Sequence, residues 1–523
     1  MKKPTLLFVI VLTITVAHII SADEPRLILR NRFTTEDEQS AFTANSVASW
    51  QQADTKQTLK ISANQRHAAN TVHTIIDLAP YAGKEIVMRC RLQAHNISKP
   101  TASYNGIKVM LHYQTPSEGK QWQSIGIPHG SFELREFSRS FLLPTDISSA
   151  QLVLGLQDST GTVIFDEVQI TLSRHQIINH PAPMQNPPPV YKGHNLPRLR
   201  GAMTGSNSIT EEDVRNFAEN WGGNLFRFQI NRNWHKANDN RDLNEYNHWI
   251  DSRLDVLEEL LSYCRKYGVC VTVDLHALPG GRYENRSMAM FYEKPYAEEF
   301  VKVWQKIAKR LKSQSMIWAY DLVNEPVHDM VQPEGMDDFR ELQFKAACAI
   351  RAIDSEMPII FEVFKWDSPE GFRYLTPIDL PNIIYQAHMY LPHNFTHQGL
   401  FDKPRDISYP GVIDGKLENR ESLRAYLQPV RDFQLAYNKH IYLGEFSAAR
   451  WAPGAERYLD DVISICEEYD WDWSYHAYRE AQCWSLEHTE TFDRVERAGE
   501  PTARLKVMKK WYAKNQKAAI PLR

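Results

Sequence analysis

The feature that most limits the possible folds is a regular alternation of apolar runs and amphipathic segments, which begins near residue 199 and continues almost to the C-terminus. Short apolar runs predict buried strands, and apolar residues that recur every three to four positions predict helices. The expected strands are 199–204, 223–230, 270–275, 318–323, 359–363, 383–389, 441–446 and 471–477. The expected helices are 210–220, 252–267, 296–312, 336–354, 418–438, 455–469 and 501–515.

Eight strands within roughly 320 residues, each followed by a helix or a long loop, match a (β/α)8 barrel. The segment after the fifth strand has the weakest helical pattern. A doubly wound open sheet is the alternative, but no strand runs into a GxGxxG or GxxxxGK[ST] loop that would support it. We therefore expect a TIM barrel of the α/β class over residues 199–516.

The preceding segment, residues 24–173, has a different pattern. Its apolar and polar residues alternate over short runs, for example at 86–92, 107–113, 151–156 and 162–170, and turn-forming residues separate the runs. A period of two with no long helical pattern predicts an antiparallel β-sandwich or jelly roll.

Two further segments are set apart by composition. Residues 174–198 contain prolines 181, 183, 187, 188 and 189, a density that predicts an extended, semi-rigid linker. Residues 1–22 combine Lys2 and Lys3 with a short apolar run and small residues at 21 and 22, as in a cleaved signal peptide. An uncleaved anchor is the alternative. We expect a secreted or periplasmic protein with no membrane attachment after cleavage.

Composition excludes several other classes of protein. The formal net charge is −4, without the basic stripe that nucleic-acid binding requires. The six cysteines are too few for a disulfide scaffold and lack the spacing of zinc ligands, so we predict no metal. The 13 Trp, 23 Tyr and 22 Phe residues are compatible with sugar binding, because sugar rings stack on aromatic rings, although a core position is the alternative for each of them.

The predicted strands of the barrel end in polar or aromatic residues. Active sites of parallel barrels lie at the C-terminal ends of the strands. The residues found there are Arg227 on strand two, His276 after strand three, Asn324 and Glu325 after strand four, His388 and Tyr390 at strand six, Glu445 on strand seven, and Trp473 and His476 on strand eight.

This set of residues suits cleavage of a glycosidic bond. Retaining hydrolases need two carboxyl groups about 5–5.5 Å apart, one to attack the anomeric carbon and one to protonate the leaving oxygen. Strands four and seven lie on opposite sides of the barrel, so Glu325 and Glu445 can face each other across a sugar. Arg227 would keep the nucleophile ionised, Tyr390 would orient it, and Asn324 would donate to the sugar 2-hydroxyl. His276 and His388 would bind hydroxyls or tune the pair.

From about residue 199 to residue 515 the chain resembles a clan A glycoside hydrolase, most closely family 5, the cellulase and mannanase family. Asn324-Glu325-Pro326 resembles its acid/base motif, and Gly444-Glu445-Phe446 its nucleophile strand. Further matching segments are Asp274-Leu275-His276, His388-Met389-Tyr390 and Arg227. The family places a sugar-stacking Trp on strand eight, for which we predict Trp473, with His476 and Trp484 behind it.

The resemblance implies a retaining double displacement at β-glycosidic bonds of a polysaccharide or oligosaccharide, of the β-glucan or β-mannan type, without a cofactor. Residues 24–173 resemble a carbohydrate-binding module, with Trp50, Trp122 and Tyr113 as candidate stacking residues; a purely supporting sandwich is the alternative. We expect a monomer. An exo-acting or transglycosylating enzyme, or a catalytically inactive sugar-binding protein, are the other functions that the same residues allow.

Overall fold

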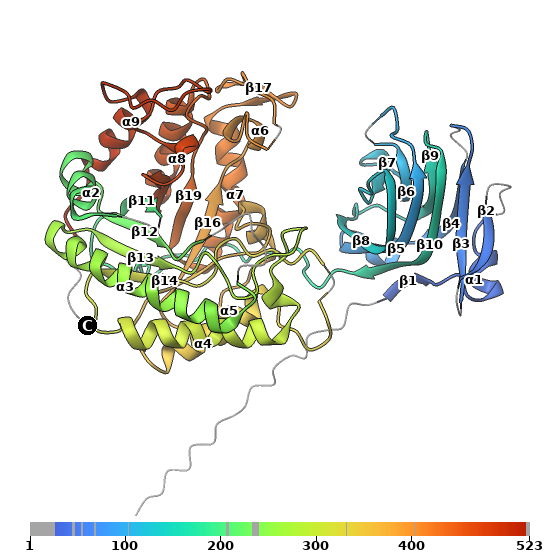
Figure 1. Ribbon diagram of the computed structural model, residues 1–523, viewed down its shortest axis with the longest axis horizontal. Helices are drawn as coiled ribbons and strands as arrows, with labels where there is room; N and C mark the ends of the chain where they lie inside the picture. The colour runs from blue at the N-terminus through green and yellow to red at the C-terminus, as the bar shows by residue number, and fades with distance from the viewer. Residues whose placement is uncertain are drawn as a thin grey trace, which may run out of the picture. The chain divides into compact units, whose positions relative to one another are not determined.

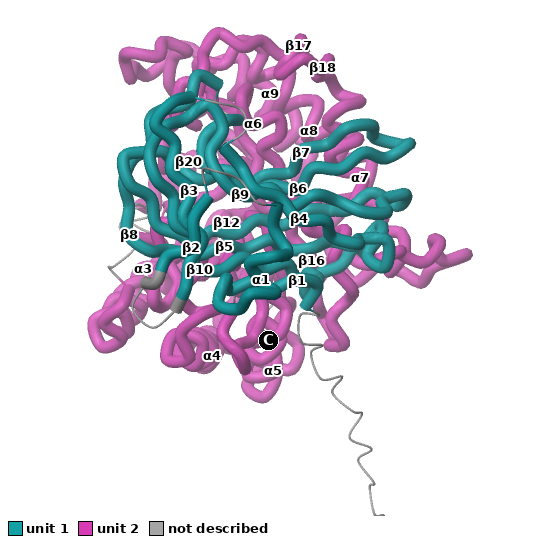
Figure 2. Tube along the Cα trace, turned by 90° about the vertical axis from the view of Figure 1, so that its right-hand side faces the viewer, with its two compact units in different colours: residues 1–177 teal, residues 178–523 magenta. Residues whose placement is uncertain are grey.

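The computed structural model describes residues 27–518 except 44–47, 54–55, 67–69, 103, 206–208, 233–239, 331 and 402, so the predicted signal peptide lies outside the described residues. The chain forms two compact units, residues 1–177 and 178–523 (Figure 2). Among the described residues, no helix is long and apolar enough to cross a membrane.

The N-terminal unit is a sandwich of two antiparallel sheets, as predicted. One sheet has the order β2-β3-β10-β5-β8, with β1 paired to β10, and the other has the order β4-β9-β6-β7. The strands are β1 (Leu27–Asn31), β2 (Ala48–Ala53), β3 (Lys56–Ala63), β4 (Asn70–Asp77), β5 (Glu85–Ile97), β6 (Gly106–Thr115), β7 (Gly119–Ser124), β8 (Gly130–Leu142), β9 (Ser149–Gln157) and β10 (Gly161–Leu172), with one short helix, α1 (Glu36–Ser40). Alternate residues such as Leu152, Leu154 and Leu156 of β9 point into the core between the sheets.

The three candidate stacking residues of this unit lie in different environments. Tyr113 is 3% exposed and belongs to the core, so it is not available to a sugar. Trp50 is partly exposed and packs against Phe33, with 6.1 Å between the ring centroids. Trp122 is 57% exposed and its ring stacks on His112 at 5.4 Å. Sugar binding by this unit stays a prediction, for which Trp122 has the required open ring.

The C-terminal unit is a closed, parallel eight-stranded barrel, which confirms the predicted fold class (Figure 1). Its strands, in order around the barrel, are β11 (Arg200–Thr204), β12 (Leu225–Gln229), β13 (Cys270–Asp274), β14 (Ile317–Asp321), β15 (Ile359–Phe361), β16 (Ile383–Met389), β19 (Ile441–Phe446) and β20 (Asp472–Tyr478). Parallel pairing of β11 with β20 closes the barrel, which brings the carboxyl ends of all eight strands to one rim.

Helices surround the barrel strands (Figure 1). They are α2 (Glu211–Arg215) with the π-helical turn η2 (Asn216–Trp221), α3 (Leu243–Tyr267), α4 (Lys294–Leu311), α5 (Phe339–Arg351), α7 (Arg420–Tyr437), α8 (Ala455–Tyr469) and α9 (Ala503–Tyr512). The 3-10 turn η4 (Pro369–Tyr374) follows β15, where the helical pattern was weakest. The short helix α6 (His393–Thr396) and the hairpin β17 (Gly411–Ile413) and β18 (Lys416–Glu418) lie between β16 and α7.

Helix α3 begins at Leu243, nine positions before the predicted start at residue 252. Asp242 caps it by accepting hydrogen bonds from the backbone N–H groups of Asn244 and Glu245 at 3.0 and 3.2 Å. A capping side chain stabilises a first turn that has few apolar residues, so the apolar pattern alone places the helix start too late.

The predicted linker 174–198 is largely wrong, because residues 178–198 belong to the barrel unit. The indole N–H of Trp318 donates to the carbonyl of Lys192 at 2.9 Å, and the Asn438 side chain donates to the carbonyl of Pro188 at 2.9 Å. The prolines do favour an extended backbone, but its carbonyl groups find donors on the barrel, and so the segment is packed instead of acting as a spacer.

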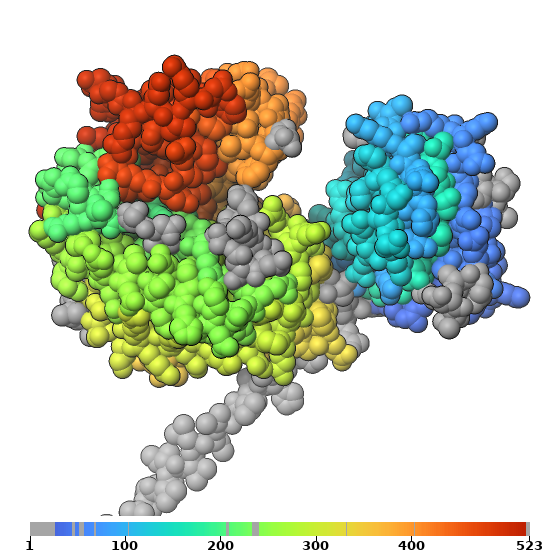
Figure 3. Space-filling model, in the orientation of Figure 1, coloured from blue at the N-terminus to red at the C-terminus, as the bar shows by residue number. Residues whose placement is uncertain are grey.

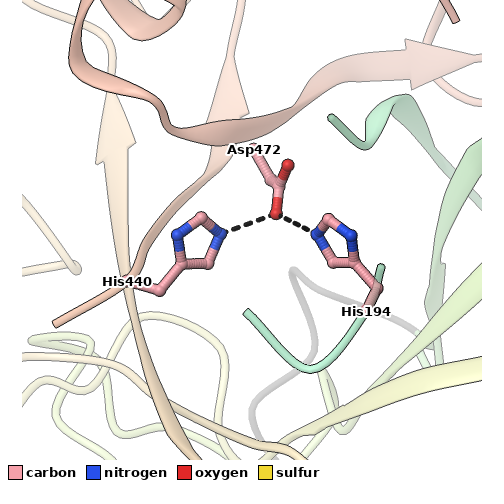
Figure 4. A group of neighbouring side chains, drawn as sticks. All are labelled: His194, His440 and Asp472. Atoms are coloured by element: carbon pink, nitrogen blue, oxygen red, sulfur yellow. Dashed lines mark hydrogen bonds and ion pairs between the residues drawn. The ribbon is translucent and has the colours of Figure 1, made fainter. Parts of the chain in front are cut away.

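The buried carboxylate of Asp472 joins the end of segment 178–198 to the N-terminal ends of strands β19 and β20 (Figure 4). Asp472, the first residue of β20, accepts from Nε2 of His194 at 2.7 Å and from Nε2 of His440 at 2.6 Å. Its other oxygen accepts from the backbone N–H of Leu199 at 2.8 Å. Burial would raise the pKa of Asp472, but the two histidines hold it well below its usual value. One ionised side chain thereby joins β20, the residue before β19 and the segment that enters β11.

Candidate active site

The carboxyl ends of the barrel strands bring together eight of the nine predicted site residues: Arg227, His276, Asn324, Glu325, His388, Tyr390, Glu445 and His476. Trp473 is the exception. The gathered side chains are buried or nearly so, and they form one continuous network of hydrogen bonds and ion pairs.

Glu445, on β19, is held by two donors. Arg227 Nη1 donates to its Oε1 at 2.6 Å, and the Tyr390 hydroxyl donates to its Oε2 at 2.7 Å. Burial alone would raise the pKa of Glu445, but the positive charges of His388, His476 and Arg227 hold it well below its usual value. Burial and the charge of Glu445 raise the pKa of Tyr390 well above its usual value, so the phenol keeps the proton that it donates. Glu445 is therefore an oriented, ionised carboxylate.

Glu325 follows β14 and has a left-handed backbone with φ of 53°. A non-glycine residue adopts this conformation only when its surroundings hold it. Its backbone N–H donates to Oε2 of Glu362 at 2.6 Å, and its carbonyl accepts from Arg282 Nη2 at 3.0 Å. Its side chain, 14% exposed, turns toward the barrel axis and contacts Nδ1 of His388 at 3.0 Å.

His388 lies between the two glutamates. Its Nδ1 is 3.0 Å from Oε1 of Glu325 and 3.8 Å from Oε2 of Glu445. A carboxylate oxygen of Glu325 and one of Glu445 lie within 4.8 Å of each other. The two carboxyl groups thus lie close to each other on either side of His388.

His276 and Asn324 lie beside this pair. Asp274 Oδ2 is 2.8 Å from Nδ1 of His276, and the Asn324 amide donates to Nε2 of His276 at 3.2 Å. Because Nε2 accepts, the proton of a neutral His276 lies on Nδ1 and points to Asp274. The Asn324 oxygen accepts from Arg227 Nη2 at 3.1 Å, which fixes the amide and leaves one of its N–H hydrogens for a ligand.

Arg227 is fully buried and joins several carboxylates. It contacts Asp321 at 2.7 Å, Glu362 at 2.9 Å, Glu445 at 2.6 Å and Asp274 at 3.4 Å. Burial would lower the pKa of Arg227, but these carboxylates raise it well above its usual value. Removal of this one cation would leave buried negative charges unpaired, which is strongly destabilising.

The sequence interpretation missed Glu362, which links the backbone of Glu325 to Arg227. One oxygen accepts from the backbone of Glu325 and the other from Arg227 and from the Gln386 amide. Burial and the nearby Asp367 and Asp321 raise its pKa well above its usual value. The signal was present: Glu362 is the charged residue in the apolar run Ile359-Ile360-Phe361-Glu362-Val363 of strand five.

The prediction that Trp473 is a sugar platform is wrong. Its ring is fully buried, stacks on Tyr512 of α9 at 5.5 Å and donates its indole N–H to Glu467 of α8 at 3.0 Å. Side chains alternate between the two faces of a strand, so Trp473 points to the helix layer while His476, three positions later, points to the barrel mouth.

Trp484, after β20, is the tryptophan at this side of the site. Its ring lies 6.1 Å from that of Tyr390, 6.0 Å from His476 and 5.1 Å from His397. A second tryptophan, Trp366, lies near Glu325, where its backbone N–H donates to the Pro326 carbonyl at 3.3 Å. Trp366 is 36% exposed, and the Arg282 guanidinium lies 5.1 Å from the centroid of the Trp366 ring. Arg282 also donates to the Glu325 carbonyl. Trp366 is thus linked through Arg282 to Glu325, and Trp484 lies beside Tyr390, which donates to Glu445.

The loops after β16, β19 and β20 contact one another. The indole N–H of Trp451 donates to the Gln398 carbonyl at 2.8 Å, and the Trp451 ring packs edge-on against Phe492 at 4.7 Å. The Arg405 guanidinium lies 4.3 Å from the centroid of the same Phe492 ring. In the space-filling view, the orange segment after β16 and the red segment after β20 form adjoining surface on the barrel unit (Figure 3).

Three groups of side chains among the described residues place donor atoms close enough for a metal ion: His194, His440 and Asp472; Glu325, His388 and Glu445; and Glu362, Asp367 and His388. In the first group the backbone N–H of Leu196 donates to Nδ1 of His194 at 3.2 Å, so a neutral His194 has its proton on Nε2, the atom that faces Asp472. A protonated nitrogen cannot bind a metal. The other two groups share His388 and belong to the glutamate network.

Comparison with known proteins gives the family. The model of the family described as cellulase, glycosyl hydrolase family 5, matches residues 188–482. Endoglucanase C of Acetivibrio thermocellus is 29% identical over 290 residues, which cover 50% of this chain and 81% of that protein. Cellodextrinase A of Ruminococcus flavefaciens is 26% identical over 275 residues, which cover 51% of this chain and 73% of that protein.

Among solved structures, Thermotoga maritima Cel5A in complex with cellobiose is 20% identical, with a TM-score of 0.46. The match covers 59% of this chain and 96% of the Cel5A chain. The family match covers more than half of the 523 residues and includes the strand ends from Arg227 to His476. The chain therefore belongs to glycosyl hydrolase family 5 and is a glycoside hydrolase.

Proposed function

We propose that this enzyme hydrolyses β-glucan by a retaining double displacement, with Glu445 as nucleophile and Glu325 as acid/base. The observation that carries the proposal is the pair of facing carboxylates, with oxygens within 4.8 Å of each other. Retaining enzymes place their two carboxyl groups about 5–5.5 Å apart, whereas inverting enzymes leave about 6.5–9.5 Å for a water molecule.

In the first step, Glu445 attacks the anomeric carbon and the bond from that carbon to the glycosidic oxygen breaks. Glu325 gives its proton to the departing oxygen, so that the leaving sugar departs as a neutral alcohol. A covalent glycosyl ester on Glu445 remains, and Glu325 is now a carboxylate.

In the second step, Glu325 removes a proton from a water molecule as the water oxygen attacks the anomeric carbon. The ester bond breaks, Glu445 leaves as a carboxylate, and Glu325 is protonated again. Two inversions at the same carbon return the β configuration.

The surroundings of each glutamate support these roles. Arg227 and the Tyr390 hydroxyl both donate to Glu445, and charge-assisted donors of this kind stabilise an ionised carboxylate. The lowered pKa of Glu445 favours an ionised nucleophile at neutral pH. Glu325 contacts His388 and lies closer to solvent than Glu445, where it can reach both the departing oxygen and the attacking water.

The names of the relatives supply the substrate class of the proposal. An endoglucanase and a cellodextrinase are among the curated proteins that the barrel matches, and both names refer to glucose polymers or their fragments. We therefore favour β-glucan over β-mannan. Export by residues 1–22 and a monomeric state stay predictions.

A panel of polysaccharides tests this proposal. We expect the purified full chain to release reducing ends from soluble β-glucans faster than from β-mannan, and to lower the viscosity of the glucan early, as internal cleavage does. Glu445→Ala should be inactive on every substrate, while Glu490→Ala, at an exposed loop position, serves as the matched control. If wild type and Glu445→Ala are equally inert while sugar still binds, the protein is a binding protein and the proposal fails.

A further inference from the structure

His476 has a more constrained position than the other histidines of the site. It lies on β20 and faces the barrel mouth, next to the proposed nucleophile. Its Nδ1 is 2.6 Å from the Tyr390 hydroxyl and 3.4 Å from Oε2 of Glu445. Its Nε2 is 2.8 Å from Oε2 of Glu480, in the turn that follows the strand. Both ring nitrogens are therefore within hydrogen-bonding distance of oxygen.

The direction of these hydrogen bonds can be deduced from the chemistry of the partners. The Tyr390 hydroxyl donates its single proton to Glu445, so toward His476 it can act only as an acceptor. Nδ1 of His476 must then carry a proton. Glu480 accepts at Nε2, which requires a proton there as well, provided that the carboxylate is ionised. Burial would raise the pKa of Glu480, but the charge of His476 lowers it below its usual value.

A neutral His476 cannot satisfy all three partners. With its proton on Nδ1, the bare Nε2 would face the Glu480 carboxylate. With its proton on Nε2, Nδ1 would accept the proton of Tyr390, and Tyr390 could no longer donate to Glu445. The doubly protonated ring is the form that makes all the hydrogen bonds of this chain at once.

We propose that Glu480 is a positioning residue of the reaction, which keeps His476 doubly protonated so that the Tyr390 hydroxyl donates to the nucleophile. This inference rests on the proposed role of Glu445. The chain of groups runs from the Glu480 carboxylate through the imidazolium and the phenol to the Glu445 carboxylate. It places a positive charge 3.4 Å from the nucleophile, on the side away from Arg227.

On balance, the charged groups around His476 favour the doubly protonated ring. Glu480 follows the strand that carries His476, Glu445 lies on the neighbouring β19, and Glu325 lies across the mouth after β14; negative charge on any of the three favours the charged ring. His397, in the loop after β16, opposes it only when charged, and burial lowers the pKa of His397 to about 3. Tyr390 is uncharged. Burial lowers the pKa of His476, but Glu480 and Glu445 raise it to about 9.

This arrangement predicts a limit to activity on the alkaline side. Because the pKa of His476 is raised to about 9, the imidazolium is present below that pH and is lost above it. In Glu480→Gln the partner still fills the space but has no charge, so His476 should lose its proton at a pH at least about one unit lower. At a pH above the pKa of His476 in both proteins, a pKa lower by one unit means about a tenfold lower fraction of charged imidazole.

Nuclear magnetic resonance measures this titration without reference to activity. In the full chain labelled with ¹³C at histidine Cε1, the His476 signal is identified by its loss in His476→Gln. We expect it to titrate near pH 9 in the wild type and at least about one unit lower in Glu480→Gln. Glu480→Asp, which restores the charge, should return the titration toward the wild-type value. A wild-type His476 that titrates below about pH 7 would overturn the inference, even if the variants failed to fold.

Kinetics supply the second measurement, in a Glu325→Ala background with a dinitrophenyl β-cellobioside. This leaving group needs no proton, so the alkaline limb of kcat/KM no longer reports the acid/base. Glu480→Gln should move that limb to lower pH, whereas Glu490→Gln should leave it in place. An equal loss at every pH would mean that Glu480 has only a structural role. If the wild type hydrolyses nothing, the proposed function fails, and the resonance experiment still decides the charge of His476.

Discussion

Glu445→Gly is expected to lose on the order of 10⁴-fold or more of kcat, because the carboxylate that forms the glycosyl ester has been removed. Sodium azide should restore turnover of an activated aryl β-glucoside or cellobioside. The small anion would occupy the space left by the carboxylate and attack the same face of the sugar. The product should be the α-glycosyl azide, with inverted configuration, because only one displacement has then occurred.

The control for this experiment is the wild type with azide, which should give the ordinary hydrolysis product. Loss of Glu445 also removes one partner of Arg227, but Asp321 and Glu362 remain at 2.7 and 2.9 Å, so the variant should fold. Circular dichroism and sugar binding would check this. A β-configured azide from Glu445→Gly would show that the two roles are assigned the wrong way round.

Glu325→Ala should have a loss that depends on the leaving group. On β-glucan, where the departing alcohol needs a proton, we expect kcat/KM to fall about 10²–10⁴-fold, which is the usual contribution of general acid catalysis. On a dinitrophenyl glycoside kcat/KM should change little, since the phenolate leaves without a proton. The glycosyl-enzyme should then accumulate, because no base activates water.

Azide should also accelerate Glu325→Ala, but with a different product. It would attack the accumulated glycosyl-enzyme from the face that water uses and yield the β-glycosyl azide, with retained configuration. The comparison of the two azide products assigns each glutamate independently of rate. Equal losses of kcat/KM on the activated and unactivated substrates would contradict the role of Glu325 as the acid.

The barrel could be predicted because its signal is local and repeated. In strands such as β16 (Ile383–Met389) and β19 (Ile441–Phe446) the predicted bounds coincide with the structure, since both faces are buried and the apolar run is continuous. The site followed from one geometric rule, that the ends of parallel strands meet at one rim. Eight of nine residues chosen by that rule do lie together.

The errors have physical causes that a local pattern does not capture. The residue type alone favours Trp473 as a sugar platform, but its strand position places it on the opposite face from His476. Residues 178–198 read as a free linker because their partners, such as Trp318 and Asn438, are more than 100 positions away. Glu362 stands out in the sequence as the charged residue of an apolar run, but its role is clear only when its donors, Arg227 and the Glu325 backbone, are known.

Glu480 belongs to the same class of residue. In the sequence it is one glutamate in a polar stretch after strand eight, with no feature that separates it from its neighbours. Only the folded chain places it 2.8 Å from His476 and, through Tyr390, in contact with the nucleophile. Residues that act through another side chain are determined by three-dimensional contacts, and this is why sequence motifs miss them.

The configuration of the first product distinguishes a double from a single displacement. Proton nuclear magnetic resonance can follow the anomeric signals while the wild-type enzyme hydrolyses a soluble β-glucan oligosaccharide, before mutarotation mixes the anomers. A double displacement through Glu445, with Glu325 as acid and then base, predicts that the newly formed reducing end appears first as the β anomer. First appearance of the α anomer would show a single displacement by water and would contradict the account.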